Sequence, residues 1–140
     1  MEHVIFFDGD TKRISWVIQT NNSTIEQKRE HANIYLDKVT DIQSKYIGLH
    51  VGIFWGIGAF IIKNQDNVKI AIDDKMMFEH LSTNQKTHDM FIEKRTYFIK
   101  QLTEQRKLKI QYKLITQDEN LAAKKNTVQR CLRPKTRVTW

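Results

Sequence analysis

The sequence predicts an α/β protein: a five-stranded mixed sheet in the order β-β-β-α-β-α-β-α, with helices packed on it. Three β-prone segments open the chain as a meander, and two later strand segments alternate with helical segments, which favours parallel pairing. The length of 140 residues and the hydrophobic content of 40% suit one domain with a packed core. We expect that domain over residues 1–131 and a C-terminal tail over residues 132–140.

The first two strands are predicted at residues 3–8 and 13–20. The first is apolar and β-prone, and the second alternates apolar and polar residues more regularly. A second turn over residues 21–23 then leads to a third strand, predicted at residues 30–39. A helix over residues 30–39 fits the pattern nearly as well, because a charged run precedes it.

The most apolar stretch of the chain is residues 46–62, which is predicted to be a buried central helix. Gly48, Gly52 and Gly56 form a ridge that would let this helix approach a sheet closely. The stretch also touches the lower length limit of a membrane span, and the ridge resembles a membrane dimer motif. Because spans usually need about 20 residues and this stretch contains His50, the buried helix is favoured.

The remaining elements follow in alternation. A short buried strand is predicted at residues 68–72, and a helical segment at 76–102 with one break in the polar run 82–85. Residues 107–116 alternate as a strand. Residues 118–120 can cap a final helix, with acidic side chains at its positive N-terminal end.

The charge balance points to polyanionic partners. The net charge of +7 favours phosphate contacts, although a solvated helix face also accounts for many of the lysines. The single cysteine, Cys131, excludes an internal disulfide and therefore the disulfide-stapled secreted domains. No signal peptide is recognisable, so an intracellular setting, cytoplasmic or nuclear, is expected.

Four short motifs, taken in this order, resemble the ribonuclease H-like superfamily, as found in retroelements and viruses. Phe7-Asp8-Gly9-Asp10 looks like its aspartate-glycine opening, and Ile72-Asp73-Asp74-Lys75-Met76-Met77 looks like its second aspartate with the following helix. Lys45-Tyr46-Ile47-Gly48-Leu49 resembles the start of the helix that carries the catalytic glutamate. The segment ending Glu119-Asn120-Leu121-Ala122-Ala123 resembles the start of the last helix. The resemblance covers nearly the whole chain and implies a ribonuclease H-like fold.

The resemblance also implies a mechanism in which four carboxylates and two Mg²⁺ ions hydrolyse RNA paired with DNA. The resemblance makes Asp8 and Asp73 the retained pair of these catalytic and metal-binding carboxylates. Lys45 stands where the glutamate is expected, and Ala123, or Lys124 in a shifted register, where the last aspartate is expected. Two carboxylates and one ammonium leave a net charge of about −1, too little to hold two dications. We therefore expect the Lys45 ammonium between Asp8 and Asp73.

Other carboxylates could substitute for the missing ligands. Asp41 and Glu119 each lie one helical turn before a missing ligand, but a turn of about 5.4 Å is large against a Mg²⁺–oxygen distance of about 2 Å. Asp10 and Asp74 lie nearer the retained pair and are the possible substitute metal ligands. Asp74 is also expected to cap the helix that follows it.

The leading functional hypothesis is a catalytically degenerate ribonuclease H-like domain with a nucleic-acid-binding or architectural role and no cofactor. Backbone phosphates of RNA, DNA or a hybrid would be contacted by basic residues on the predicted active face and final helix. These residues are Lys12, Arg13, Lys45, Lys124, Lys125 and Arg130.

Two alternatives stay open. One is an active metal-dependent ribonuclease H that uses Mg²⁺ or Mn²⁺ to cleave RNA in RNA/DNA hybrids. The other is a protein-interaction module, with a protein partner or a homo-oligomer, that binds no nucleic acid. No membrane partner is expected in any of the three.

Overall fold

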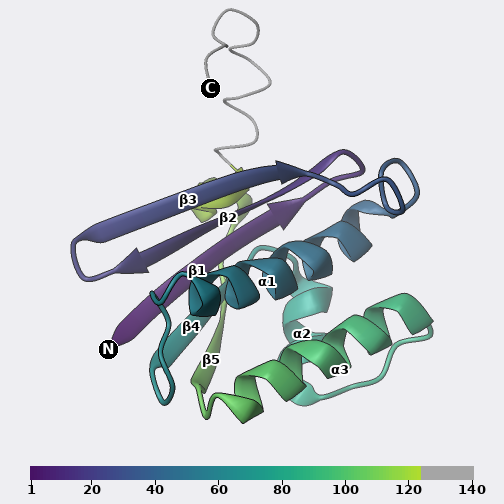
Figure 1. Cartoon of the computed structure of the whole chain (residues 1–140). Helices are drawn as coiled ribbons and strands as arrows, with labels where there is room; N and C mark the ends of the chain where they lie inside the picture. Colours follow the sequence, from purple (N-terminus) through teal and green to yellow (C-terminus); the bar gives the residue numbers. More distant parts are fainter. Residues whose placement is uncertain (124–140) are drawn as a thin grey trace, which may run out of the picture.

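Five strands form one mixed sheet in the order β3-β2-β1-β4-β5 (Figure 1). The strands are β1 (Glu2–Gly9), β2 (Arg13–Thr20), β3 (Ser23–Glu30), β4 (Asn67–Ile72) and β5 (Lys109–Leu114). β1 is antiparallel to β2 and parallel to β4, β2 is antiparallel to β3, and β4 is parallel to β5. The predicted fold class is confirmed by this computed structural model, which describes residues 1–123.

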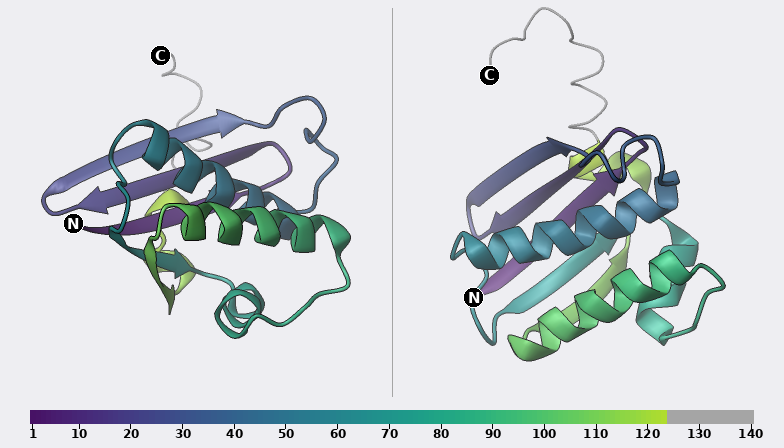
Figure 2. Two further views of the ribbon diagram at one scale, coloured as in Figure 1. Left: turned by 60° about the horizontal axis from the view of Figure 1, so that its bottom comes forward. Right: turned by 45° about the vertical axis from the view of Figure 1, so that its right-hand side comes forward.

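Three helices cover one face of the sheet (Figure 2). They are α1 (Asp41–Gly58), α2 (Lys75–Thr83) and α3 (Met90–Gln105). α1 packs on β1 and β2, and α3 packs beside α1. A short 3-10 helix, η1 (Gln117–Glu119), precedes helical residues 121–123, where the carbonyl of Ala122 accepts a hydrogen bond of 3.2 Å from the Ser15 hydroxyl. Because Trp16 contacts α1 and Ser15 points to the opposite face, the final helical turn lies on that opposite face.

The third strand is where the sequence prediction is wrong. β3 runs over Ser23–Glu30 and residues 31–40 form turns, neither the strand nor the alternative helix predicted at 30–39. Thr20 pairs with Ser23, so only Asn21 and Asn22 connect the strands, and Asn21 has the positive φ of 55° that asparagine tolerates. β3 is an edge strand and keeps its charged side chains near solvent. The charged run in this segment therefore made a strand look less favourable than it is.

The predicted central helix and its glycine ridge are confirmed in α1. The helix begins earlier than predicted, because Thr40 and Gln43 form a capping box, and it ends earlier, at Gly58 and not at residue 62. A Cβ atom at Gly48 would lie 2.8 Å from the carbonyl oxygen of Asp8, so the ridge allows α1 to touch the end of β1. In the described part of the chain, no helix is long and apolar enough to cross a membrane.

The later elements agree with their predictions. The helical segment predicted at 76–102 is broken as expected, because α2 ends at Thr83 and Asn84 takes the left-handed conformation typical of a helix C-terminus. Asp89 then caps α3 by accepting hydrogen bonds from the backbone of its first turn. β5 lies inside the range 107–116 predicted for it.

α3 is attached to α1 through a histidine and an arginine. The Arg95 guanidinium lies 3.0 Å from Nδ1 of His50, whose ring stacks on Phe98 with 6.3 Å between centroids. Burial, and then the charge of Arg95, lower the pKa of His50 from 6.5 to about 4. His50 is therefore neutral in the folded protein at pH values where it is charged in the unfolded chain.

This shift predicts a loss of stability in mild acid. As pH falls from about 6.5 to about 4, the unfolded chain binds a proton at His50 that the folded protein does not, so stability is lost through this window. We expect a loss of roughly 1–3 kcal/mol, since His50 is only partly shielded from solvent. Urea unfolding across this range measures it. His50→Gln should flatten the dependence, whereas His88→Gln, at an exposed position, should leave it unchanged; equal slopes for the two variants would contradict the assignment.

Candidate functional site

Asp8 and Asp73 meet at one edge of the sheet, where the parallel strands β1 and β4 end. Phe6 pairs with Ala71, and each aspartate lies two residues further along its strand, so both carboxylates project from the same face. The Asp8 side chain is 17% exposed and that of Asp73 only 3%. The pairing of these two carboxylates, which the family resemblance implied, follows directly from the parallel register.

The Lys45 ammonium lies between these two carboxylates, as expected from the sequence. Its Nζ is 2.8 Å from Oδ1 of Asp73 and 3.2 Å from Oδ1 of Asp8. Lys45 lies near the start of α1, and glycine at position 9 brings this end of the helix against β1. A Cβ atom at Gly9 would lie 2.6 Å from the carbonyl oxygen of Ser44. Close backbone contact therefore places the lysine where it can bridge the pair.

Electrostatics keep this lysine charged. Burial lowers the pKa of Lys45, but the hydrogen bond to Asp73 and the negative charges of Asp8 and Asp73 outweigh burial, so that its pKa is raised above 10.5. Lys45 is thus an ammonium at any physiological pH. The Lys45 side chain is only 14% exposed, so the three charges interact in a partly desolvated setting.

Asn120 completes the surroundings of Asp73. Its side-chain amide is fully buried and donates to Oδ2 of Asp73 at 2.9 Å and to the carbonyl of Phe7 at 3.0 Å. Its Oδ1 accepts from the backbone N–H groups of Ala122 and Ala123, so Asn120 also caps the final helical turn. The cap was predicted from the run 118–120, but the contact with Asp73 was not. Both carboxylate oxygens of Asp73 therefore accept hydrogen bonds, Oδ1 from Lys45 and Oδ2 from Asn120.

The two positions where the resemblance implies further carboxylates, 45 and 123, are a lysine and an alanine. Ala123, the last described residue, places a methyl group in the final helical turn. Glu119, one turn earlier, accepts hydrogen bonds from the backbone and hydroxyl of Thr116 in a capping box. Those hydrogen bonds lower the pKa of Glu119 and engage its carboxylate within its own turn.

The possible substitutes nearer the pair have structural contacts of their own. Oδ1 of Asp10 accepts from the backbone N–H groups of Lys12 and Arg13 and so shapes the turn between β1 and β2. Asp74 caps α2 through the N–H of Met77 at 2.9 Å, which confirms its predicted capping role. Asp41 is exposed in the first turn of α1.

The residues at this site do not fit a two-metal centre. Within residues 1–123, no three or more His, Cys, Asp or Glu side chains gather closely enough to hold a metal ion. A Mg²⁺ ion needs oxygen ligands at about 2 Å in a near-octahedral arrangement. Here the space between the two retained carboxylates is taken by the Lys45 ammonium, and the net charge of the cluster is about −1.

Of the basic residues proposed to contact phosphates, the structure describes three. Lys12 is 57% exposed and forms an exposed ion pair of 2.7 Å with Asp37. Arg13 begins β2 and is partly buried, and Lys45 belongs to the ion-pair cluster. The other predicted contacts and the predicted tail lie outside the described residues: Lys124, Lys125, Arg130 and residues 132–140.

Next to Lys45, one buried hydrogen-bond chain was not predicted at all. The Tyr46 hydroxyl lies 2.7 Å from Nδ1 of His80, and Nε2 of His80 lies 3.0 Å from the Glu93 carboxylate. Burial, with nearby carboxylates, raises the pKa of Tyr46, so its hydroxyl stays protonated. These residues come from three different helices, and no local sequence pattern joins them.

Three solved structures are similar to this fold. Ribonuclease H1 from Halobacterium salinarum NRC-1 is 13% identical, with a TM-score of 0.73 over 89% of this chain and 93% of that one. LC11-RNase H1, solved with an RNA/DNA hybrid, is 13% identical, with a TM-score of 0.67 over 91% of this chain and 99% of that one. A foamy viral protease-reverse transcriptase solved with double-stranded DNA is 12% identical, with a TM-score of 0.52 over 82% of this chain and 21% of that one.

Sequence comparison adds nothing to this structural likeness. No protein-family model matches the chain, and no curated protein sequence matches it. The likeness to the solved structures is therefore one of fold.

Proposed function

We propose that this chain, which has the ribonuclease H-like fold, binds nucleic acid through its phosphate backbone and does not hydrolyse it. The observation that carries the proposal is the Lys45 ammonium, which bridges Asp8 and Asp73 at 3.2 and 2.8 Å. A positive side chain at this place supplies the neutralising charge that the two carboxylates need to lie side by side.

The proposed loss of hydrolysis follows from competition for the same place. A dication could be held by Asp8 and Asp73 only after Lys45 had moved away from both carboxylates. Both Asp73 oxygens would also have to exchange donors, since Oδ1 accepts from Lys45 and Oδ2 from Asn120. Even then, two carboxylates balance only half the charge of two Mg²⁺ ions. The chain would thus keep Asp8 and Asp73 side by side without binding the cations.

Nucleic acid is the proposed partner for two reasons. Structurally similar proteins have been solved with an RNA/DNA hybrid and with double-stranded DNA. The net charge of +7 gives this chain the sign that a phosphate backbone requires. Lys12 and Arg13, which flank the turn beside the end of β1, are the described residues proposed to contact phosphates, together with Lys124, Lys125 and Arg130.

Salt-dependent binding tests this function. Fluorescence anisotropy with a labelled RNA/DNA hybrid and with duplex DNA should show affinity falling linearly with salt on a double-logarithmic scale. Lys12→Gln and Arg13→Gln should each reduce the slope by about 0.9, the loss of one phosphate contact. Lys63→Gln removes the same charge beyond the other end of α1 and should leave the slope unchanged.

Two results would contradict the proposed binding. One is affinity that does not change with salt. The other is an absence of binding to both duplexes together with a defined oligomer in light scattering, which would favour a protein-interaction module. An equal slope change for Lys63→Gln would show that net charge, not the proposed contact surface, governs binding.

A further inference from the structure

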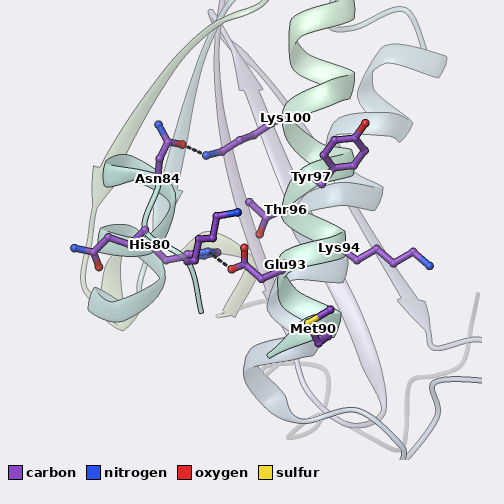
Figure 3. A pocket seen from close by; sticks show the side chains of 10 residues that line it. His80, Asn84, Met90, Glu93, Lys94, Thr96, Tyr97 and Lys100 are labelled. Carbon is purple, nitrogen blue, oxygen red and sulfur yellow. Dashed lines mark hydrogen bonds and ion pairs between the residues drawn. The ribbon is translucent and has the colours of Figure 1, made fainter. Parts of the chain in front are cut away.

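A second candidate site lies between α2 and α3. It uses none of the residues of the ion-pair cluster formed by Asp8, Lys45 and Asp73. It is a cavity of about 560 Å³ bounded by the end of α2, the loop that follows it and one side of α3 (Figure 3). This volume falls in the range of about 300–1,000 Å³ in which proteins bind small molecules. The residues that matter for its chemistry are His80, Lys86, Glu93, Thr96, Tyr97 and Lys100.

One residue that lines this cavity, Thr96, has a buried polar atom without a partner. Thr96 is 6% exposed, and its hydroxyl is buried without any hydrogen bond among the described residues. One turn before it on α3, the Glu93 carboxylate accepts hydrogen bonds from the backbone of Thr87 at 2.7 Å and from His80 at 3.0 Å. A buried hydroxyl with no partner is unfavourable, so a ligand group that hydrogen-bonded to it would remove that cost.

The rim of the cavity is positive. Lys86, Lys94 and Lys100 line it against one carboxylate, Glu93, which leaves a net charge of about +2 when His80 is neutral. Lys100 is oriented across the opening, because its ammonium donates to Oδ1 of Asn84 at the end of α2 (Figure 3). The hydrogen bond from Thr87 lowers the pKa of Glu93, so the single negative charge persists. A dianion such as a phosphate monoester matches this balance.

The same cavity offers apolar surface to a ligand. Tyr97 is 61% exposed and Met90 is 80% exposed, although both are large apolar side chains on α3. Aromatic rings stack on planar ligand groups, and exposed apolar surface beside a few polar groups is typical of a ligand site. An anionic group and a planar group are thus accommodated side by side.

We propose that this cavity binds a phosphate-bearing ligand of the size of a nucleoside monophosphate. The phosphate contacts Lys86 and Lys100, and the planar base packs on Tyr97. A polar group of the base or sugar bonds to the Thr96 hydroxyl. The site is separate from the proposed nucleic-acid contacts at Lys12 and Arg13, so either can fail while the other holds.

Calorimetric titration of the full chain with adenosine 5′-monophosphate tests this. We expect it to bind at least about tenfold more tightly than adenosine or inorganic phosphate alone, since each lacks one half of the recognised groups. Lys86→Gln and Lys100→Gln should each weaken binding about 5–10-fold. Thr96→Val should weaken it about 3–5-fold while leaving the protein as stable or more stable, because it removes the unpartnered hydroxyl. Lys12→Gln, outside the cavity, should have no effect.

Competition binding experiments distinguish the two sources of the phosphate, a free nucleotide and the 5′ end of a nucleic-acid strand. A short oligonucleotide with a 5′-phosphate that displaces adenosine monophosphate, when its unphosphorylated form does not, identifies a strand end as the ligand. Failure of both oligonucleotides to compete identifies a free nucleotide, and each result supports the site. The proposal is overturned by no binding at millimolar nucleotide, by equal competition from the unphosphorylated strand, or by unchanged binding in Lys86→Gln, Lys100→Gln and Thr96→Val.

Discussion

Replacement of Lys45 by methionine is expected to lower the free energy of unfolding by about 3–5 kcal/mol at neutral pH. The substitution keeps the length of the side chain but removes the ammonium that Asp8 and Asp73 share, and these carboxylates are only 17% and 3% exposed. Their mutual repulsion in a partly desolvated place would then be uncompensated. Urea unfolding monitored by circular dichroism gives the value directly.

An exposed ion pair elsewhere in the chain provides the matched control. Lys12 and Asp37 lie 2.7 Å apart, as close as the pair of Lys45 with Asp73, but their side chains are 57% and 54% exposed. Lys12→Met should therefore cost less than about 1 kcal/mol. Part of the loss in Lys45→Met should return when Asp8→Asn is added, because one of the repelling charges is removed. If Lys45→Met costs no more than Lys12→Met, the bridging role of Lys45 is wrong.

Replacement of Asn120 by alanine is expected to cost about 2–4 kcal/mol. The buried side chain bonds the Asp73 carboxylate and the Phe7 carbonyl through its amide nitrogen, and it caps the final helical turn through its oxygen. Alanine would leave these buried groups without their partners and would also open a small cavity. Thermal and urea unfolding both report the loss.

Two further variants separate the cap from the contact with Asp73. Asn120→Asp keeps an oxygen that can cap the helical turn, but it places a second carboxylate against Asp73. It should therefore be at least as damaging as Asn120→Ala at neutral pH and recover as pH falls toward about 4. Asn64→Ala, at an exposed position, should change stability by less than about 0.5 kcal/mol. A neutral effect of Asn120→Asp would show that the amide donor to Asp73 does not matter.

Most of the fold could be predicted because its signals are local. β1, β2 and β4 are apolar runs bounded by turn residues, and the break between α2 and α3 follows from a polar run. The bridge made by Lys45 was also predicted, because the family resemblance aligns Lys45 with a residue of the site and the parallel strands bring Asp8 and Asp73 together at one end of the sheet. β3 was not predictable by the same means, because an edge strand does not bury the alternating face that marks a strand in sequence.

Several contacts in the two candidate sites could not be predicted, because they depend on tertiary packing that the sequence does not reveal. The contact of Asn120 with Asp73 joins residues 47 positions apart in the chain, and the hydrogen bonds from Tyr46 through His80 to Glu93 join three helices. The orphaned Thr96 hydroxyl is visible only once the neighbours of α3 are known. Each arises from tertiary contacts between residues far apart in the chain, where periodicity carries no information.

Hydrolysis is the property that most directly tests the role assigned to Lys45. The purified chain should be incubated with a labelled RNA/DNA hybrid in Mg²⁺ and, separately, in Mn²⁺, beside the Asp8→Asn and Asp73→Asn variants. We expect the hybrid to stay intact and all three proteins to give the same background, because the Lys45 ammonium lies between the two carboxylates that would have to bind the cations. Metal-dependent cleavage by the unaltered chain that disappears in both variants would contradict this and establish an active nuclease.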